Sequence, residues 1–254
     1  MKFGVCCGIE NLSLLKKYGY DYIELNFSKI TTCSREEFDA TRRELEKWGL
    51  AAESFNGFFP SSVSLNKEAD YNYIREYCAT GFARAKEIGG KTVVLGSGGS
   101  RKIPEGYDRS TAEEQFVQVL RICGEEAEKR GITVAIEPLR IKECNFINTV
   151  EEGMEFVRRA NHPNVKCLAD FFHVAESGES LHAIETAGEN LAHVHLALPE
   201  SRLFPTPKDR PICEVWKAAL QKCGYDARIS LEGKAAPDVE TAIREAKAAL
   251  EIFR

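Results

Sequence analysis

The chain has 254 residues, of which 43% are hydrophobic and 29% are charged, as is ordinary for a globular protein. Its formal net charge of −5 argues against broad electrostatic binding of nucleic acid or of an anionic membrane. No apolar run approaches the ~20 residues that a membrane helix needs, and the first residues, MKFGVCCGIE, lack a signal-peptide pattern, so we expect a cytoplasmic protein.

Eight apolar segments, rich in Val, Ile, Leu, Ala and Cys, have the composition of strands that are covered on both faces. Before five of them a helical stretch ends near a basic residue and a glycine follows, as in KKYG, EKWG, KEIGG, EKRG and QKCG. A cation near the last carbonyls and a glycine in the left-handed conformation both favour a helix end there. In chain order the predicted strands are 2–7, 22–27, 51–56, 92–97, 132–137, 165–170, 191–197 and 228–232.

The segments between these strands carry helical signals. Apolar residues in the segment 69–88 recur at the spacing of one helix face and predict packing on the core. Eight strands, each followed by a helix, in about 250 residues predict an α/β fold, a (β/α)8 TIM barrel in which residues 1–254 form a single domain. The apolar face comprises Ile74, Tyr77, Cys78, Phe82, Ala85 and Ile88. Capping boxes are predicted at Ser34-x-x-Glu37, Thr111-x-x-Glu114 and Thr149-x-x-Glu152.

The nine cysteines are odd in number, irregular in spacing and without a CxxC pair. We therefore expect small, mostly buried side chains in a reducing compartment, and no metal or redox role.

Four consecutive predicted strands end in a potential metal ligand, and they deliver Glu137, Asp170, His195 and Glu232. Chemistry in this barrel lies at the carboxyl ends of the strands, so the four side chains should meet on one rim. Three carboxylates packed closely would repel each other and lose solvation, and a divalent cation resolves that conflict. Hard oxygen ligands with one imidazole suit Mn²⁺, with Mg²⁺ or Co²⁺ as alternatives.

The same strand ends resemble those of the xylose-isomerase-like sugar epimerases, especially the ketose 3-epimerases. The resemblance lies in four segments: EPLRIKECNFINT at 137–149, DFFH at 170–173, HVH at 193–195 and SLEG at 230–233. The resemblance implies that Glu137, Asp170, His195 and Glu232 bind one divalent metal ion, and that Glu143, His173 and Arg202 contact the sugar. It also implies a possible homo-oligomer, a dimer or a tetramer.

Proton transfer next to a sugar carbonyl is the reaction that this set suits. A metal ion stabilises the enediolate as a Lewis acid, and Glu137 and Glu232 would act as the catalytic acid and base on opposite sides of a ketose or related small polyol carbonyl compound. Return of the proton to the same carbon gives epimerisation, and return to its neighbour gives aldose–ketose isomerisation. A dehydratase acting on inososes, or a lyase that cleaves C-glycosides, remains an alternative on the same scaffold.

A DNA-repair endonuclease on this scaffold is disfavoured. Such relatives carry extra histidines on strands three and four and an Asp-x-His after strand seven, where this chain has SFNGFF, LGSGGS and PESR. The acidic balance also lacks the footprint of a DNA-binding protein.

Four secondary features remain. His193 shares a strand face with His195, one layer deeper, so we expect a hydrogen-bonded interior histidine, while His162 and His182 should lie on the surface. The glycine-rich segment 95–102 lacks P-loop spacing; it predicts a flexible rim loop, with Arg101 and Lys102 as possible phosphate contacts. The segment 55–59 could form an apolar wall against the sugar or pack in the barrel top.

Overall fold

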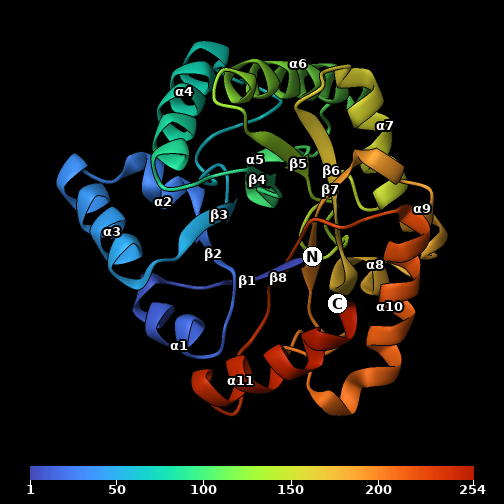
Figure 1. Ribbon diagram of the computed structural model, residues 1–254. Coiled ribbons are helices and arrows are strands. Elements are labelled where there is room, and N and C mark those ends of the chain that lie inside the picture. Colours follow the sequence, from blue (N-terminus) through green and yellow to red (C-terminus); the bar gives the residue numbers. More distant parts are fainter.

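Eight parallel strands close into a barrel in the computed structural model, which describes residues 1–254. The strands follow chain order, and β8 pairs with β1 to complete the ring (Figure 1). The strands are β1 Lys2–Cys6, β2 Tyr22–Asn26, β3 Ala51–Asn56, β4 Thr92–Leu95, β5 Thr133–Ile136, β6 Val165–Asp170, β7 Leu191–Leu196 and β8 Arg228–Leu231. The predicted (β/α)8 barrel is therefore confirmed, and each predicted strand coincides with an observed one.

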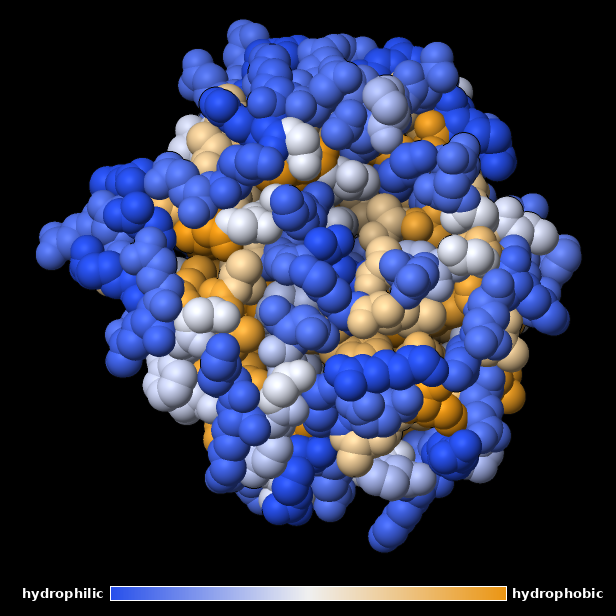
Figure 2. All heavy atoms as spheres, in the orientation of Figure 1, coloured by the Kyte–Doolittle hydropathy of each residue, from blue (hydrophilic) through white to orange (hydrophobic).

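Helices surround this barrel, as Figure 1 shows. Their outer surface carries most of the hydrophilic residues in the view of Figure 2, while hydrophobic residues show in the gaps between them. None of them has the length and hydropathy of a membrane-spanning segment. The helices are α1 Leu12–Lys17, α2 Phe27–Thr32, α3 Arg35–Trp48, α4 Tyr71–Glu87, α5 Gly98–Arg101, α6 Arg109–Glu128, α7 Val150–Ala160, α8 Phe171–Glu176, α9 His182–Glu185, α10 Arg210–Cys223 and α11 Val239–Leu250, with single 3-10 turns η1 Ile9–Asn11, η2 Gly188–Asn190, η3 Pro207–Asp209 and η4 Glu251–Phe253.

The glycine joints between helices and strands form as predicted. Gly49 and Gly224 close α3 and α10 in the left-handed conformation, with φ of 61° and 74°. Only glycine adopts that conformation without a steric cost, which explains its place at these five joints. The remaining joints also have positive φ, at Gly19, Gly89 and Gly131.

Two of the three predicted capping boxes need correction. Ser34 and Glu37 form the complete box at the start of α3. The box at Thr111 is wrong, because α6 starts earlier and Asp108 caps it by accepting from the Thr111 backbone N–H at 2.8 Å. Thr149 does cap α7, but the Glu152 carboxylate accepts from the N–H of Asn148 instead of that of Thr149.

One hydrophobic cluster of 68 buried residues joins the barrel to its helices. The apolar face predicted for the segment 69–88 belongs to it, since all six of its residues are buried, five on α4 and Ile88 at its C-cap. All nine cysteines are free; six are buried and three are half-buried. The six buried ones pack as small apolar side chains, as expected, whereas the Cys6 sulfur lies within 4.8 Å of ligand atoms of His195 and Glu232.

The amino-terminal end of the barrel is held together by charge. Glu53 of β3 accepts from Lys2 of β1 at 2.6 Å and from Arg228 of β8 at 2.6 Å. Burial raises the pKa of Glu53, but the hydrogen bonds and charges of Lys2 and Arg228 lower it by more than burial raises it. The net shift of the pKa is therefore downward. In barrels of this type the active site lies at the opposite end, where the carboxyl ends of the strands meet.

Candidate active site and metal centre

The structure brings the four predicted metal ligands together at the ends of β5 to β8. One ligand atom from each of Glu137, Asp170, His195 and Glu232 lies within 4.8 Å of those of the others. Nδ1 of His195 is 3.3 Å from Oε1 of Glu137 and 3.6 Å from Oε2 of Glu232. Parallel pairing sets Asp170 of β6 directly beside His195 of β7.

Local structure aims two of these carboxylates into the centre. Asp170 is the N-cap of α8, and its Oδ1 accepts from the backbone N–H of Phe172 at 2.8 Å. Its other oxygen, Oδ2, is buried without a hydrogen-bond partner and faces the cluster. Glu137 packs against Gly96, where an added Cβ would lie 2.2 Å from Oε2 of Glu137. A side chain at position 96 would therefore force the Glu137 carboxylate to shift.

The electrostatics of the cluster fit a cation. Burial first, and then the charges of Glu232 and Glu137, raise the pKa of Asp170 to about 8. Burial and Glu232 also raise the pKa of Glu137. Crowded carboxylates bind protons tightly when no other cation balances them, and a divalent ion supplies that balance. Three hard oxygen donors, one imidazole and the unpartnered Oδ2 of Asp170 therefore fit such an ion.

Glu24 contacts this cluster, and the sequence interpretation did not single it out. It lies in the middle of β2, only 1% exposed, and its Oε1 is 2.9 Å from Nε2 of His195. Its Oε2 is 2.8 Å from Nε2 of His193 and also accepts from Ser230. The contact confirms His193 as a hydrogen-bonded interior histidine. The available signal was a carboxylate in the otherwise apolar run YIEL, since a buried charge needs partners.

Arg202 reaches the centre from the loop after β7. Its Nη2 donates to Oε2 of Glu232 at 2.9 Å, and its Nη1 donates to Oε1 of Glu143 at 3.2 Å. The guanidinium also lies over the ring of Phe172, 4.8 Å from its centroid. The structure thus joins two of the three predicted sugar contacts to a predicted catalytic residue.

His173 is buried on α8 with one ring nitrogen directed at the centre. Its Nδ1 accepts from the backbone N–H of Arg140 at 3.3 Å. Burial, followed by the charge of Arg202, lowers the pKa of His173 to about 3, so the neutral ring carries its proton on Nε2. Nε2 has no hydrogen-bond partner and lies 3.6 Å from Oδ2 of Asp170. It is therefore a free donor facing the site.

Arg140 is a second residue that sequence patterns did not single out. Its side chain donates to Glu143 at 2.8 Å and to Glu176 at 2.9 Å. Glu143 thus lies between Arg140 and Arg202, which holds its carboxylate at the mouth of the site.

The two remaining histidines differ from each other. His182 is exposed, as predicted, with 75% of its side chain accessible. His162 is half-buried instead, because Gly124 of α6 leaves room for its ring.

The segment 95–102 departs from the predicted rim loop. It contains helix α5, and Arg101 is fully buried, donating to the carbonyl oxygens of Leu95 at 3.1 Å and Ile147 at 3.3 Å. Arg101 therefore ties the end of β4 to the connection between β5 and α7 and does not extend toward a substrate. Lys102 is exposed.

The aromatic residues after β3 pack inward. Phe58 is fully buried against Phe27, with ring centroids 4.7 Å apart, and Phe59 stacks on Phe58 at 4.4 Å. They are barrel-top packing, the second of the two predicted possibilities. Asn56 is the exception, because its Nδ2 donates to Oε1 of Glu232 at 3.0 Å.

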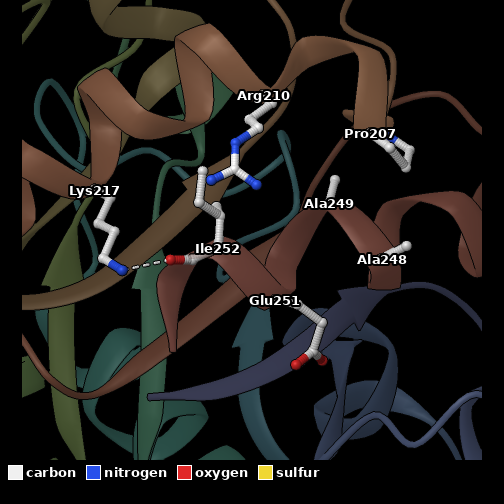
Figure 3. A pocket seen from close by; sticks show the side chains of 7 residues that line it. All are labelled: Pro207, Arg210, Lys217, Ala248, Ala249, Glu251 and Ile252. Atoms are coloured by element: carbon white, nitrogen blue, oxygen red, sulfur yellow. Dashed lines mark hydrogen bonds between the residues drawn. The ribbon is translucent and has the colours of Figure 1, made fainter.

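A cavity of about 380 Å³ opens beside the cluster, over the ends of β1, β2 and β3. Glu24 and Asn56, which contact His195 and Glu232, form part of its wall. A separate hollow of about 390 Å³ lies between α10 and the C-terminal turn (Figure 3). There Lys217 donates to the carbonyl of Ile252 at 2.6 Å, and none of the predicted site residues is present.

Comparison with known proteins identifies the family to which this chain belongs. The family described as "Xylose isomerase-like TIM barrel" matches residues 12–253. D-psicose 3-epimerase of Ruminiclostridium cellulolyticum is 33% identical over 126 residues, which cover 49% of this chain and 42% of that protein. Inosose isomerase of Bacillus velezensis is 24% identical over 253 residues, covering 88% of this chain and 82% of the relative. The chain therefore spans less than half of the first relative.

Solved structures agree on the fold. D-psicose 3-epimerase from Clostridium cellulolyticum H10, crystallised with D-tagatose, superimposes with a TM-score of 0.85. That alignment covers 100% of this chain and 98% of the other at 22% identity, which establishes a shared fold.

Proposed function

Because this chain belongs to the xylose isomerase-like TIM barrel family, we propose that it is a metal-dependent sugar epimerase or isomerase acting through an enediolate. The observation that carries the proposal is the cluster of three carboxylates and one imidazole, three of the four residues buried, at the ends of four consecutive strands. The relatives named as D-psicose 3-epimerase and inosose isomerase support the same reaction class.

Glu137, Asp170, His195 and Glu232 would hold one divalent ion, with Mn²⁺ preferred and Mg²⁺ or Co²⁺ possible alternatives. When bound, the ion supplies Lewis-acid stabilisation of the negative charge that develops on the substrate oxygens. The mutual repulsion of the three carboxylates would in turn be offset by the charge of the bound ion.

Glu137 and Glu232 are the proposed acid and base. Glu232 is fixed by Arg202 and Asn56 at 2.9 Å and 3.0 Å, which holds its carboxylate in one orientation. Glu137 is buried, with His195 as its side-chain partner at 3.3 Å. One carboxylate would remove the proton next to the carbonyl, and the other would return a proton to the same or to the adjacent carbon.

The sugar contacts follow from the free donors. Nε2 of His173 would donate to a substrate oxygen, while Arg202 and Glu143 would bind hydroxyl groups at the mouth. The cavity of about 380 Å³ beside the cluster has room for the non-reacting end of a small sugar or polyol. A small-molecule substrate is therefore proposed.

Isotope exchange tests the proposal directly. Protein with Mn²⁺ in D₂O is incubated with free and phosphorylated ketoses, aldoses and inososes, and each compound is followed by NMR. We expect metal-dependent deuterium entry next to a carbonyl, lost in Glu137→Gln and retained in the exposed control His182→Gln. The labelled carbon separates epimerisation from isomerisation. Loss of water would assign a dehydratase, and metal binding without any exchange would refute the reaction class.

A further inference from the structure

We propose that Glu24 is a positioning residue: its carboxylate holds the His195 ring so that Nε2–H faces β2 and the lone pair of Nδ1 faces the metal centre. The inference rests on the proposed metal site and adds a residue to it from a strand that supplies none of the four ligands.

The two nitrogens of His195 face different groups. Nε2 lies 2.9 Å from Oε1 of Glu24, and Nδ1 lies 3.3 Å from Oε1 of Glu137. An ionised carboxylate can only accept, so the hydrogen at the Glu24 contact must belong to Nε2. In a neutral ring Nδ1 then has a lone pair directed at Glu137 and Glu232. The lone pair and the two carboxylates repel each other unless a cation, either a proton on Nδ1 or a divalent ion, lies between them.

The contact crosses the inside of the barrel. β2 pairs with β1 and β3, whereas His195 lies on β7, which pairs with β6 and β8. The pairing of β2 with β3 shifts register between Ile23 and Glu24, and such an irregularity changes the direction of a side chain. Glu24 can therefore support the ligand from behind, opposite the ion.

Further hydrogen bonds fix Glu24 itself. His193 contacts Oε2 of Glu24 at 2.8 Å, and Ser230 also donates to Oε2. The Ser230 hydroxyl in turn lies 2.8 Å from the hydroxyl of Tyr22. With these partners in a fully buried setting, the Glu24 carboxylate is held in one orientation. Its hydrogen bond to Nε2 then fixes the orientation of the His195 ring. Outer hydrogen bonds of this kind fix the tautomer and orientation of a ligating imidazole.

Mn²⁺ titration followed by electron paramagnetic resonance tests the role. The signal of free Mn²⁺ during the titration gives both the number of binding sites per chain and their affinity. Misfolding of a variant would lower the number of sites, whereas loss of positioning would lower the affinity. We expect Glu24→Gln to weaken Mn²⁺ binding roughly 10- to 100-fold, as is typical for such outer partners. Glu24→Met, which offers no oxygen to Nε2, should weaken it further.

Glu53→Gln is the matched control. Glu53 is also a buried carboxylate in a barrel strand, but its partners are Lys2 and Arg228 at the opposite end. We expect its substitution to change stability and leave Mn²⁺ affinity unaltered.

Nitrogen NMR supplies a second readout that needs no Glu24 variant. Wild-type protein labelled at histidine and loaded with diamagnetic Mg²⁺ should show His195 protonated at Nε2, with the signals assigned by their loss in His195→Gln. Protonation at Nδ1, or wild-type Mn²⁺ affinity in both Glu24 variants, would overturn the positioning role alone. Wild-type protein that binds neither ion would overturn the proposed metal site together with this role.

Discussion

Arg202 donates a hydrogen bond of 2.9 Å from Nη2 to Oε2 of Glu232, so a loop residue after β7 holds a carboxylate at the end of β8. The same guanidinium reaches Glu143, a residue of the β5–α7 connection, at 3.2 Å. Three connections of the barrel rim are therefore joined by one side chain, which makes the mouth of the site a single unit.

Arg202→Lys should lower kcat/KM for whichever substrate the exchange assay identifies. Lysine has a single charged nitrogen and cannot bridge two carboxylates with separate N–H groups. Loss of one charged hydrogen bond, worth about 1.5–3 kcal/mol, predicts a decrease of roughly 10- to 100-fold. Steady-state kinetics measures it, with the exposed Arg210→Lys as the control. Unchanged kinetics would show that the Arg202 bridge is dispensable.

Asp170→Asn should stabilise the metal-free protein and remove most of the stabilisation that added Mn²⁺ gives. Oδ2 of Asp170 is buried without a partner among like charges, so neutralising it should raise the melting temperature of metal-free protein. Ligand binding at 100 times Kd stabilises a folded protein by about 2.7 kcal/mol. Added Mn²⁺ should therefore raise the melting temperature of wild type and have little effect on the variant. Thermal unfolding with and without a chelator measures both effects; equal Mn²⁺ responses would argue against Asp170 as a ligand.

Glu53 should make stability depend on pH at the acidic end. Its folded-state pKa is lowered, so its contribution is present above the unfolded pKa of about 4.3 and is lost as pH falls through the lower folded value. Glu53→Gln should cost roughly 2 kcal/mol near neutral pH, the size of a charged hydrogen bond. Urea unfolding of both proteins along a pH series measures it, and the difference should shrink below the unfolded pKa. A constant difference would assign the effect to packing.

Gly96→Ala should weaken the metal centre without entering it. The new Cβ would lie 2.2 Å from Oε2 of Glu137, so the carboxylate must move. Mn²⁺ affinity should fall in a titration, while the fold is retained. Gly99→Ala is the matched control, because its Cβ meets the Cβ of Ser61 at 3.0 Å and not Glu137. Equal affinities in the two variants would show that Glu137 can shift at no cost.

Much of the fold was predictable because its signals are local. A glycine at a helix end and an apolar run of strand length act through backbone conformation and burial within a few residues. The predicted strands and the glycine joints, such as Gly49 and Gly224, are accordingly confirmed. The start of α6 shows the limit. Asp and Thr are both favourable N-cap residues, so the residue types at 108 and 111 do not show where the helix begins.

The sequence alone determined the order of strands and helices and the presence of a potential ligand at four successive strand ends, since both follow from local patterns. Only the closed barrel decided that Glu24 meets His195 and that Arg101 is buried instead of facing a substrate. Glu24 and His195 are separated by 171 positions along the chain and lie on strands that do not pair. The physical reason is that such contacts depend on how the whole ring of strands closes, a property that no short segment carries.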